Sequence, residues 1–270
     1  MVLRFQLLQK VNRYTSRQVD RWARVYLSTF SVYNSRMAPL ALVTGAAHRL
    51  GKVFALTLAR HGFDIVLHYH QSIDAARQTQ AEVESLGRRV ILSRADLTDP
   101  AQISSLLSEV DSLRVLVNSA ALMLGDHVHS LAVENWDTSL DLNLRAPFLL
   151  AQVCAKKMTG GGLIVNITDV GAQKAWSRYP SYTVSKAALE SLTKVLARAL
   201  APEIRVNAIA PGLVLQSDIV SDEEWQRLIN RIPLKRPART EEIASALEFL
   251  LKNEYITGQT IVVDGGYSLI

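Results

Sequence analysis

One stretch early in the chain carries the strongest architectural signal: Leu42-Val43-Thr44-Gly45-Ala46-Ala47-His48-Arg49-Leu50-Gly51. It passes from an apolar pair into a turn with two glycines and then into a helical pattern, so it predicts a strand, a tight turn and a helix. Gly45 permits the turn and Gly51 lets the helix pack near the sheet, while the first N–H groups of the helix face an anion. Two glycines can also simply punctuate a strand–helix turn, and this stretch alone does not separate the two interpretations.

Alternating strand and helix patterns continue along the rest of the chain. Short Val/Ile/Leu runs, typical of strands buried on both faces, predict a parallel sheet with right-handed helical crossovers. The expected strands are residues 40–44, 64–68, 90–93, 115–118, 163–167, 205–209 and 260–263. The expected helices are residues 52–61, 73–86, 101–110, 133–158, 181–201, 222–230 and 241–251. Residues 38–270 therefore predict one α/β domain, a doubly wound Rossmann-type seven-stranded parallel sheet with helices on both faces.

The turn after the second expected strand bears on the choice of cofactor. In dinucleotide-binding sheets a carboxylate here accepts hydrogen bonds from an unphosphorylated ribose, but in this chain no acid follows until Asp74. The side chains present suit a 2′-phosphate together with Arg49 of the glycine turn: His68, Tyr69, His70 and Ser72. The sequence therefore favours NADPH over NADH. His48, His68 and His70 can instead be surface or loop histidines, and they form no metal-ligand set.

Asp96 and Leu97 follow the third expected strand. Asp96 is placed to accept a hydrogen bond from the amino group of an adenine. The alternative is that it caps the helix that begins near Pro100.

The pair Tyr182 and Lys186 gives the clearest sign of chemistry. Residues four apart on a helix share a face, and a cation one turn away lowers the pKa of a phenol by stabilising the phenolate. Such a tyrosine can exchange a proton with a substrate near neutral pH. Asp169 follows the apolar run 163–167, so a carboxylate at a strand end is expected to face the Tyr/Lys helix. Together the three residues predict a proton-transfer site.

The positive charge of the chain is concentrated at its N-terminal end. The formal net charge is +5, but residues 1–37 carry +6 and the remainder −1, so the body offers no basic face for nucleic acid. Residues 1–37 are interpreted as an extension ahead of a true start at Met37, a mitochondrial-type targeting peptide, or a helical arm that docks on a partner.

Composition also bears on location. No apolar run approaches the roughly 20 residues that span a bilayer. We expect a cytoplasmic protein, or an organellar one if residues 1–37 are a targeting peptide. The single cysteine, Cys154, rules out an internal disulfide and is expected in the core.

Seven short motifs in a fixed order give the chain a family resemblance. They are Thr44-Gly45 with Gly51; Asp96; Asn118-Ser119-Ala120; Asn143; Tyr182 with Lys186; Pro211-Gly212; and Thr257-Gly258 with Asp264-Gly265-Gly266. From residue 40 to residue 269 the chain resembles the short-chain dehydrogenases/reductases. That resemblance implies hydride transfer with a nicotinamide cofactor and assembly as a homotetramer through long helices, with residues 133–158 and 181–201 as candidates.

Within that family the chain is most similar to the pteridine reductase and dihydromonapterin reductase branch. The shared features are Arg49 in the glycine turn, the stretch 68–72, the chain end 263–269, and Asp169 where most members carry a catalytic Ser. Three positions depart from the branch: Met123 stands where an aromatic side chain often sandwiches the pterin, Ala121 replaces a Ser, and Ser119 replaces an Asn. A Met packs less rigidly on a flat ring.

The resemblance implies a role for each site residue. Lys186 would bind the nicotinamide ribose and lower the pKa of Tyr182, Tyr182 would donate the proton, and Asn143 would hold a water that links Lys186 to solvent. Asp169 would face the N–H edge of an aminopyrimidine ring. The alternative for Asp169 is that it caps the end of the strand, and the alternative for Asn143 is that it makes a purely structural hydrogen bond. The further expected cofactor contacts are Gly45, His48, Arg49, Leu50, Gly51, Leu97, Asn118, Ser119, Ala120, Pro211 and Gly212. The expected substrate pocket is Arg49, Met123, Asp169, Leu213 and Trp225.

Three functions remain open on the sequence. The first is an NADPH-dependent reductase of a pterin or a similar C=N-bearing heterocycle. The second is an NADPH-dependent carbonyl reductase of another small substrate, which Met123 and Ala121 favour. The third is a nucleotide-binding regulatory protein with vestigial chemistry, against which the intact set Asn143, Tyr182 and Lys186 argues.

Overall fold

The computed structural model describes residues 38–270, except residue 126 and residues 218 and 219. The interpretations of residues 1–37 therefore lie outside the described part. The described residues are built around a seven-stranded sheet in the order β3-β2-β1-β4-β5-β6-β7, and every neighbouring pair of strands is parallel. The strands are β1 Leu40–Val43, β2 Asp64–Tyr69, β3 Val90–Arg94, β4 Val115–Asn118, β5 Gly162–Ile167, β6 Ile204–Pro211 and β7 Thr260–Val263. The predicted doubly wound parallel sheet is confirmed.

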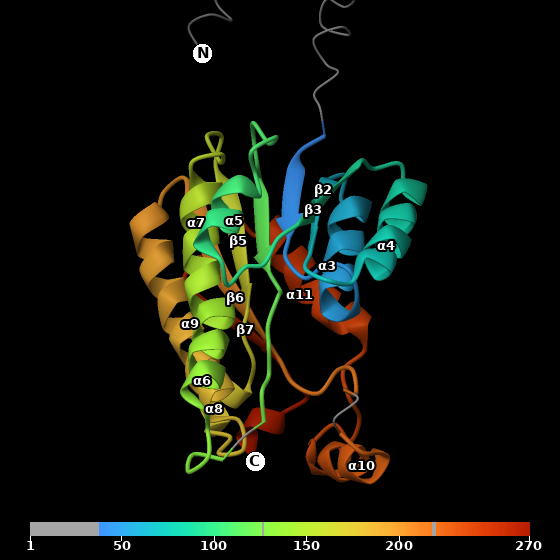
Figure 1. Ribbon diagram of the computed structural model, residues 1–270. Helices are drawn as coiled ribbons and strands as arrows, with labels where there is room; N and C mark the ends of the chain where they lie inside the picture. The colour runs from blue at the N-terminus through green and yellow to red at the C-terminus, as the bar shows by residue number, and fades with distance from the viewer. Residues whose placement is uncertain (1–37, 126, 218–219) are drawn as a thin grey trace, which may run out of the picture. The chain divides into compact units, whose positions relative to one another are not determined.

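Strand residues alternate between two cores, which explains why the strands read as continuous apolar runs. In β1, Val43 packs into the core under one helical layer, whereas its neighbour Leu42 packs into the core under the other. The first layer consists of α3 (Arg49–Arg60), α4 (Ile73–Ser85) and α11 (Thr240–Lys252). The second consists of α5 (Pro100–Ser105), α7 (Ala146–Ala155) and α9 (Pro180–Leu200). Figure 1 shows the two layers on opposite sides of the sheet.

The helix expected over residues 133–158 is interrupted. It consists of α6 (Val133–Leu140), a π-helical turn η1 (Asp141–Arg145) and α7, which ends at Ala155. Pro147 in the first turn of α7 has no N–H to donate, so regular α-helical pairing cannot run through this point. A π turn inserted into a helix often marks a functional site, and this one contains Asn143.

Other boundaries differ from the sequence-based expectation in smaller ways. The helix expected over residues 101–110 ends as α5 at Ser105, while α10 (Asp222–Arg231) matches its prediction closely. Two short elements were not predicted: α8 (Gly171–Lys174) and a 3₁₀ turn η2 (Tyr267–Leu269). Within the described residues, every helix is too short or too polar to cross a membrane.

The order of the strands places a crevice between β1 and β4. From β1 the chain builds outward through β2 and β3, then returns to the other side of β1 with β4. Ligands of open α/β sheets bind at such a reversal, beyond the carboxyl ends of the strands. The glycine turn after β1 and Ser119 after β4 both lie there.

Candidate active site

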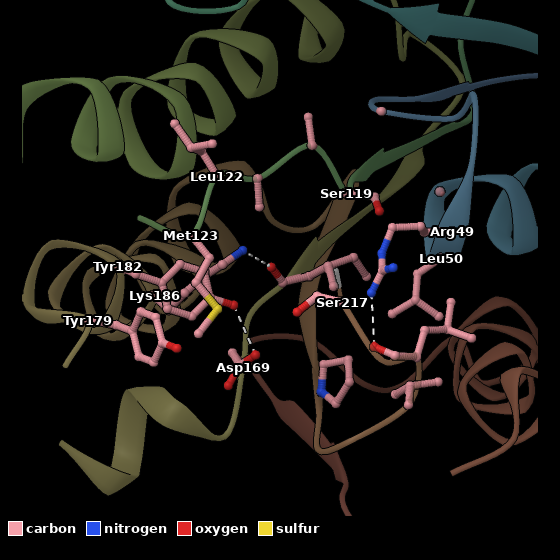
Figure 2. Close-up of a pocket in the computed structure, with 18 of the residues that line it drawn as sticks. Arg49, Leu50, Ser119, Leu122, Met123, Asp169, Tyr179, Tyr182, Lys186 and Ser217 are labelled. Carbon is pink, nitrogen blue, oxygen red and sulfur yellow. Dashed lines mark hydrogen bonds between the residues drawn. The ribbon is translucent and has the colours of Figure 1, made fainter. Parts of the chain in front are cut away.

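A cavity of about 1360 Å³ opens at the carboxyl ends of the strands. Cavities for one small ligand measure roughly 300–1,000 Å³, so this one has room for a dinucleotide and a substrate. All predicted cofactor and substrate-pocket residues line it except Asn118, and the predicted catalytic residue Asn143 also lies outside the lining. Figure 2 shows Arg49, Ser119, Asp169, Tyr182 and Lys186 around the same space.

The glycine turn is fixed by close backbone packing. Gly45 has a φ of 63°, in the left-handed region that favours glycine. A Cβ on Gly51 would lie 2.0 Å from the carbonyl oxygen of Gly45, so helix α3 can start here only with a glycine at position 51. Oγ1 of Thr44 accepts hydrogen bonds from the N–H groups of Ser119 (2.9 Å) and Ala120 (3.0 Å). The turn after β1 is thereby held against the segment after β4.

His68 holds the same turn from the other side. Its Nδ1 lies 3.1 Å from the N–H nitrogen of Gly45, and its Nε2 lies 3.1 Å from the carbonyl oxygen of Ala95. The side chain is only 2% exposed. The alternative interpretation of His68 as a surface or loop histidine is therefore wrong.

The far end of the cavity is lined by the residues expected at the adenine and ribose: Tyr69, His70, Ser72, Asp96 and Leu97. Oδ1 of Asp96 accepts hydrogen bonds from the N–H (2.9 Å) and hydroxyl (2.7 Å) of Thr98, and these bonds lower the pKa of Asp96. The cap of α5 is Asp99, which accepts from the N–H of Ala101. Asp96 is thus not the helix cap that the sequence allowed.

Arg49 reaches across the cavity to the segment after β6. Its guanidinium donates to the carbonyl oxygens of Leu215 (2.9 Å) and Gln216 (3.1 Å). The sequence had suggested only that Arg49 meets a phosphate and the substrate. The structure adds a direct tie between the glycine turn and the segment that follows β6.

The three expected catalytic side chains converge at the middle of the cavity. The hydroxyl of Tyr182 donates to Oδ2 of Asp169 at 2.9 Å, and Oδ1 of Asp169 accepts from the N–H of Gly171 at 2.7 Å. Nζ of Lys186 donates to the carbonyl oxygen of Ile167 at 2.7 Å and lies 5.7 Å from the centre of the Tyr182 ring. All three side chains come from the carboxyl end of β5 and the first turns of α9.

The expected lowering of the Tyr182 pKa is not observed in this structure. Burial raises the pKa of Tyr182 well above its ordinary value, and the carboxyl of Asp169 raises it further by opposing a phenolate. Burial also raises the pKa of Asp169 and lowers that of Lys186 to about 8. The prediction was wrong here because it counted the cation alone, whereas desolvation and a neighbouring carboxyl dominate.

Two predicted site residues act through hydrogen bonds beneath the cavity. Asn143 exchanges bonds with the backbone of Leu122 at 2.9 Å and donates to Oγ of Ser185 at 3.0 Å. Asn118 donates to Oδ1 of Asn166 at 2.8 Å, which ties β4 to β5. The expected contact between Asn118 and the cofactor is not supported by its position, because the residue is only 3% exposed and does not line the cavity.

The substrate end of the cavity is more aromatic than the sequence indicated. Met123, Leu213 and Trp225 line it as expected, and so do three aromatic residues that had received no role: Trp176, Tyr179 and Tyr267. The ring of Trp176 packs edge-on against Tyr179, with centroids 6.4 Å apart, and lies 6.3 Å from Tyr267. Tyr179 had one usable signal, since it stands three residues before Tyr182 on the side facing the site. Trp176 lies in the segment between α8 and α9, and Tyr267 begins the short 3₁₀ turn η2, where spacing gives no such signal. Among the described residues, no group of three His, Cys, Asp or Glu side chains is placed to bind a metal.

Comparisons with known proteins identify the family. Residues 45–268 match the family model described as Enoyl-(Acyl carrier protein) reductase. The chain is 37% identical to 1-cyclohexenylcarbonyl-CoA reductase of Streptomyces collinus, covering 86% of this chain and 87% of the relative. It is 34% identical to a 3-oxoacyl-[acyl-carrier-protein] reductase of Synechocystis sp., covering 85% and 96%.

A solved structure supports the same assignment. FolM Alternative dihydrofolate reductase 1 from Brucella canis, complexed with NADP, superposes with a TM-score of 0.81 at 36% identity, covering 86% of this chain and 94% of that one. The chain therefore belongs to the short-chain dehydrogenase/reductase family. It is an oxidoreductase of that family, as its fold and its Tyr182/Lys186 site indicate.

Proposed function

We propose that the protein is an NADPH-dependent reductase that transfers a hydride to a pterin or a related C=N-bearing heterocycle. The residues present fit the cofactor. The first N–H groups of α3 have no helical partner and border the cavity, which suits a diphosphate. Lys186 uses one of its three N–H donors on Ile167, so two remain for ribose hydroxyls. His70 and Ser72 line the end where a 2′-phosphate would bind, with no carboxylate in their stretch.

NADPH supplies the hydride when it is bound; the protein supplies the proton and the orientation. Tyr182 carries its proton at neutral pH and can donate it to a ring nitrogen or a carbonyl oxygen; because its raised pKa makes it a weak acid, the phenolate that forms needs stabilisation. The ammonium of Lys186 then stabilises the phenolate that donation leaves behind. Asn143 holds the segment at Leu122 and the start of α9 in register, which keeps Tyr182 and Lys186 aligned.

The observation that carries the pterin proposal is the half-buried carboxyl of Asp169, which lines the cavity and is bonded to Tyr182. An ionised carboxylate orients a carbonyl oxygen poorly, whereas it accepts two parallel bonds from the N–H edge of an aminopyrimidine. Burial raises the pKa of Asp169, and a protonated carboxyl can donate to a ring nitrogen as well as to a carbonyl oxygen, so the preference for a pterin rests on the N–H edge. Similarity to FolM Alternative dihydrofolate reductase 1 supports the same substrate class.

A second candidate is the reduction of a carbonyl group in another small substrate. Met123 and Ala121 line the cavity where an aromatic side chain and a Ser would grip a pterin. The relatives from Streptomyces collinus and Synechocystis sp. are reductases of acyl thioesters by name. A protein with only vestigial chemistry fits less well, because Tyr182 is hydrogen-bonded to Asp169 and Nζ of Lys186 lies 5.7 Å from the centre of the Tyr182 ring.

Oxidation of NADPH by the purified protein separates these functions. The protein is mixed with NADPH and, in turn, a dihydropterin, dihydrofolate and a panel of ketones and aldehydes. The proposal predicts turnover of the pterin substrates with a kcat/KM at least roughly tenfold above that of any carbonyl compound. Turnover of carbonyls alone would favour the second candidate. Tight NADPH binding without turnover of any substrate would favour the regulatory role.

We further propose a homotetramer and a cytoplasmic location. Apolar side chains are exposed on the outer faces of α7 and α9, at Phe148, Val184 and Val195, and on α11 and β7, at Phe249 and Val262. Contact between copies would cover them. Light scattering of the purified protein tests the assembly, and fractionation of cells that express the full chain tests the location.

A further inference from the structure

We propose that His68 is a positioning residue for the cofactor: its neutral imidazole fixes the glycine turn in the conformation that receives the dinucleotide diphosphate. The inference rests on the NADPH binding proposed above. No step of the reaction uses His68, yet it is buried and borders the cavity beside the glycine turn.

The hydrogen bonds of His68 specify one tautomer. The carbonyl oxygen of Ala95 can only accept, so Nε2 carries the proton and donates to it. The N–H of Gly45 can only donate, so Nδ1 accepts with its lone pair. An imidazolium would place two N–H groups against each other at Gly45. Both partners are backbone groups, which do not change their protonation state. The tautomer of His68 is therefore fixed by these two contacts.

The same residue holds two successive N–H groups of the turn. The ring of His68 accepts from Gly45, and the carbonyl oxygen of His68 accepts from Ala46 at 2.9 Å. These bonds direct the first N–H groups of the turn toward β2. The next unpaired N–H groups, at the start of α3, are left for an anion. The ring position therefore determines where the anion-binding end of α3 lies.

His68 also connects the two loops that border the cofactor end of the cavity. Its Ala95 partner directly precedes Asp96 and Leu97, which line the cavity, and Gly45 belongs to the turn on the other side. Thr44 binds the turn toward β4. Clamped from both neighbouring strands, the turn is organised before any ligand binds, which reduces the entropic cost of binding.

The surroundings keep His68 neutral. The charged or titratable groups near it are His70, which disfavours a second positive charge, and Asp96, which weakly favours one. Burial is the largest influence, and the pKa of His68 is lowered to about 4. The neutral tautomer is therefore the form present near pH 7.

Two conservative variants separate the two hydrogen bonds of the ring. In His68→Asn, the amide oxygen occupies the place of Nδ1 and keeps the acceptor for Gly45. In His68→Gln, the longer amide reaches the place of Nε2 and keeps the donor to Ala95. His68→Leu removes both. The Kd for NADPH is measured by fluorescence titration, and the Tm of each variant without cofactor is measured alongside.

The expected order of NADPH affinity follows the Gly45 contact. His68→Asn should stay within about threefold of the wild-type Kd, whereas His68→Gln and His68→Leu should weaken binding roughly tenfold or more, since each leaves a buried N–H unpaired. If His68 only stabilised the fold, the loss of NADPH affinity in each variant would follow the fall in its Tm. Equal losses for Asn and Gln, or a smaller loss for Gln, would overturn the inference.

A measurement on the wild-type protein covers the case in which the variants do not fold. In protein labelled with ¹⁵N-histidine, the imidazole spectrum should show His68 protonated at Nε2 alone, with a change on NADPH binding. Protonation at Nδ1 would overturn the inference. If the wild-type protein did not bind NADPH, the proposed function itself would be overturned. That result can be obtained without any variant, so the two failures are distinguishable.

Discussion

The hydroxyl of Tyr182 and the carboxyl of Asp169 form a hydrogen bond of 2.9 Å inside the cavity, where Tyr182 is buried and Asp169 is half-buried. Burial raises the pKa of both groups, and the Asp169 carboxyl raises that of Tyr182 further, whereas the hydrogen bond from Tyr182 lowers that of Asp169. At neutral pH the pair therefore holds at least one proton where a substrate would bind. A hydride acceptor placed beside Tyr182 would find a proton donor already oriented.

Replacing Tyr182 with Phe should remove most of the turnover and leave cofactor binding in place. General acid catalysis contributes about 10²–10⁴ in rate, so kcat should fall by a factor in that range. The Kd for NADPH should change less than about threefold, because Lys186 keeps its bond to Ile167. The two quantities are measured by steady-state kinetics and fluorescence titration. Equal losses in kcat and in NADPH affinity would contradict the role of Tyr182.

Replacing Asp169 with Ser should lower kcat/KM for a pterin substrate more than for a ketone. A Ser hydroxyl can orient a carbonyl oxygen, but it cannot accept two parallel N–H bonds, and a lost charged hydrogen bond costs roughly 10- to 100-fold. Asp169→Asn is the matched control, since it keeps the shape and one acceptor oxygen. A larger loss for the ketone than for the pterin would count against the assigned substrate class.

The rate of reduction should fall on the alkaline side as Lys186 loses its proton. Its pKa is lowered to about 8 by burial, so kcat/KM should decline as pH rises through about 8, whereas Tyr182 titrates far above this range. Below pH 8 the ammonium is present and the rate is maintained. Steady-state kinetics between pH 6 and 10 measure the profile. If kcat/KM began to fall only near pH 10, a group other than Lys186 would be responsible for the alkaline decline.

Much of the fold was predictable because strands that are buried on both faces appear in the sequence as continuous runs of apolar residues. The run at β1 places Leu42 and Val43 in separate cores, and such runs located all seven strands within a few residues. The break at Asp141–Arg145 was missed because apolar spacing continues through it, although Pro147 was a usable signal that the helical hydrogen bonding changes there.

The residues of the candidate site were predictable from the sequence, but the pKa shifts within the site were not. Nearly every expected cofactor and pocket residue lines the cavity. The pKa shift of Tyr182 had the wrong sign because it depends on how deeply the pair with Asp169 is buried, which sequence spacing does not report. The place of Trp176 depends on the irregular path between α8 and α9, where no period constrains a side chain.

Replacing Arg49 with Lys should loosen the segment after β6. The guanidinium bonds the carbonyl oxygens of Leu215 and Gln216 at once, a fork geometry that a single ammonium reproduces poorly. Peptides that contain residues 213–217 should exchange their amide hydrogens faster in Arg49→Lys, because their tie to the glycine turn is weakened. The KM for the substrate should rise roughly three- to tenfold, since this segment borders the substrate end of the cavity.

The control for Arg49 is Arg94→Lys, because Arg94 also donates to a backbone carbonyl, that of His70, but lies outside the cavity lining. It should leave both hydrogen exchange at residues 213–217 and the substrate KM unchanged. If Arg49→Lys raised only the Kd for NADPH and left exchange at residues 213–217 at the wild-type rate, the arginine would serve the cofactor alone. A rise in exchange with an unchanged KM would show that the segment is tied to the glycine turn but does not hold the substrate.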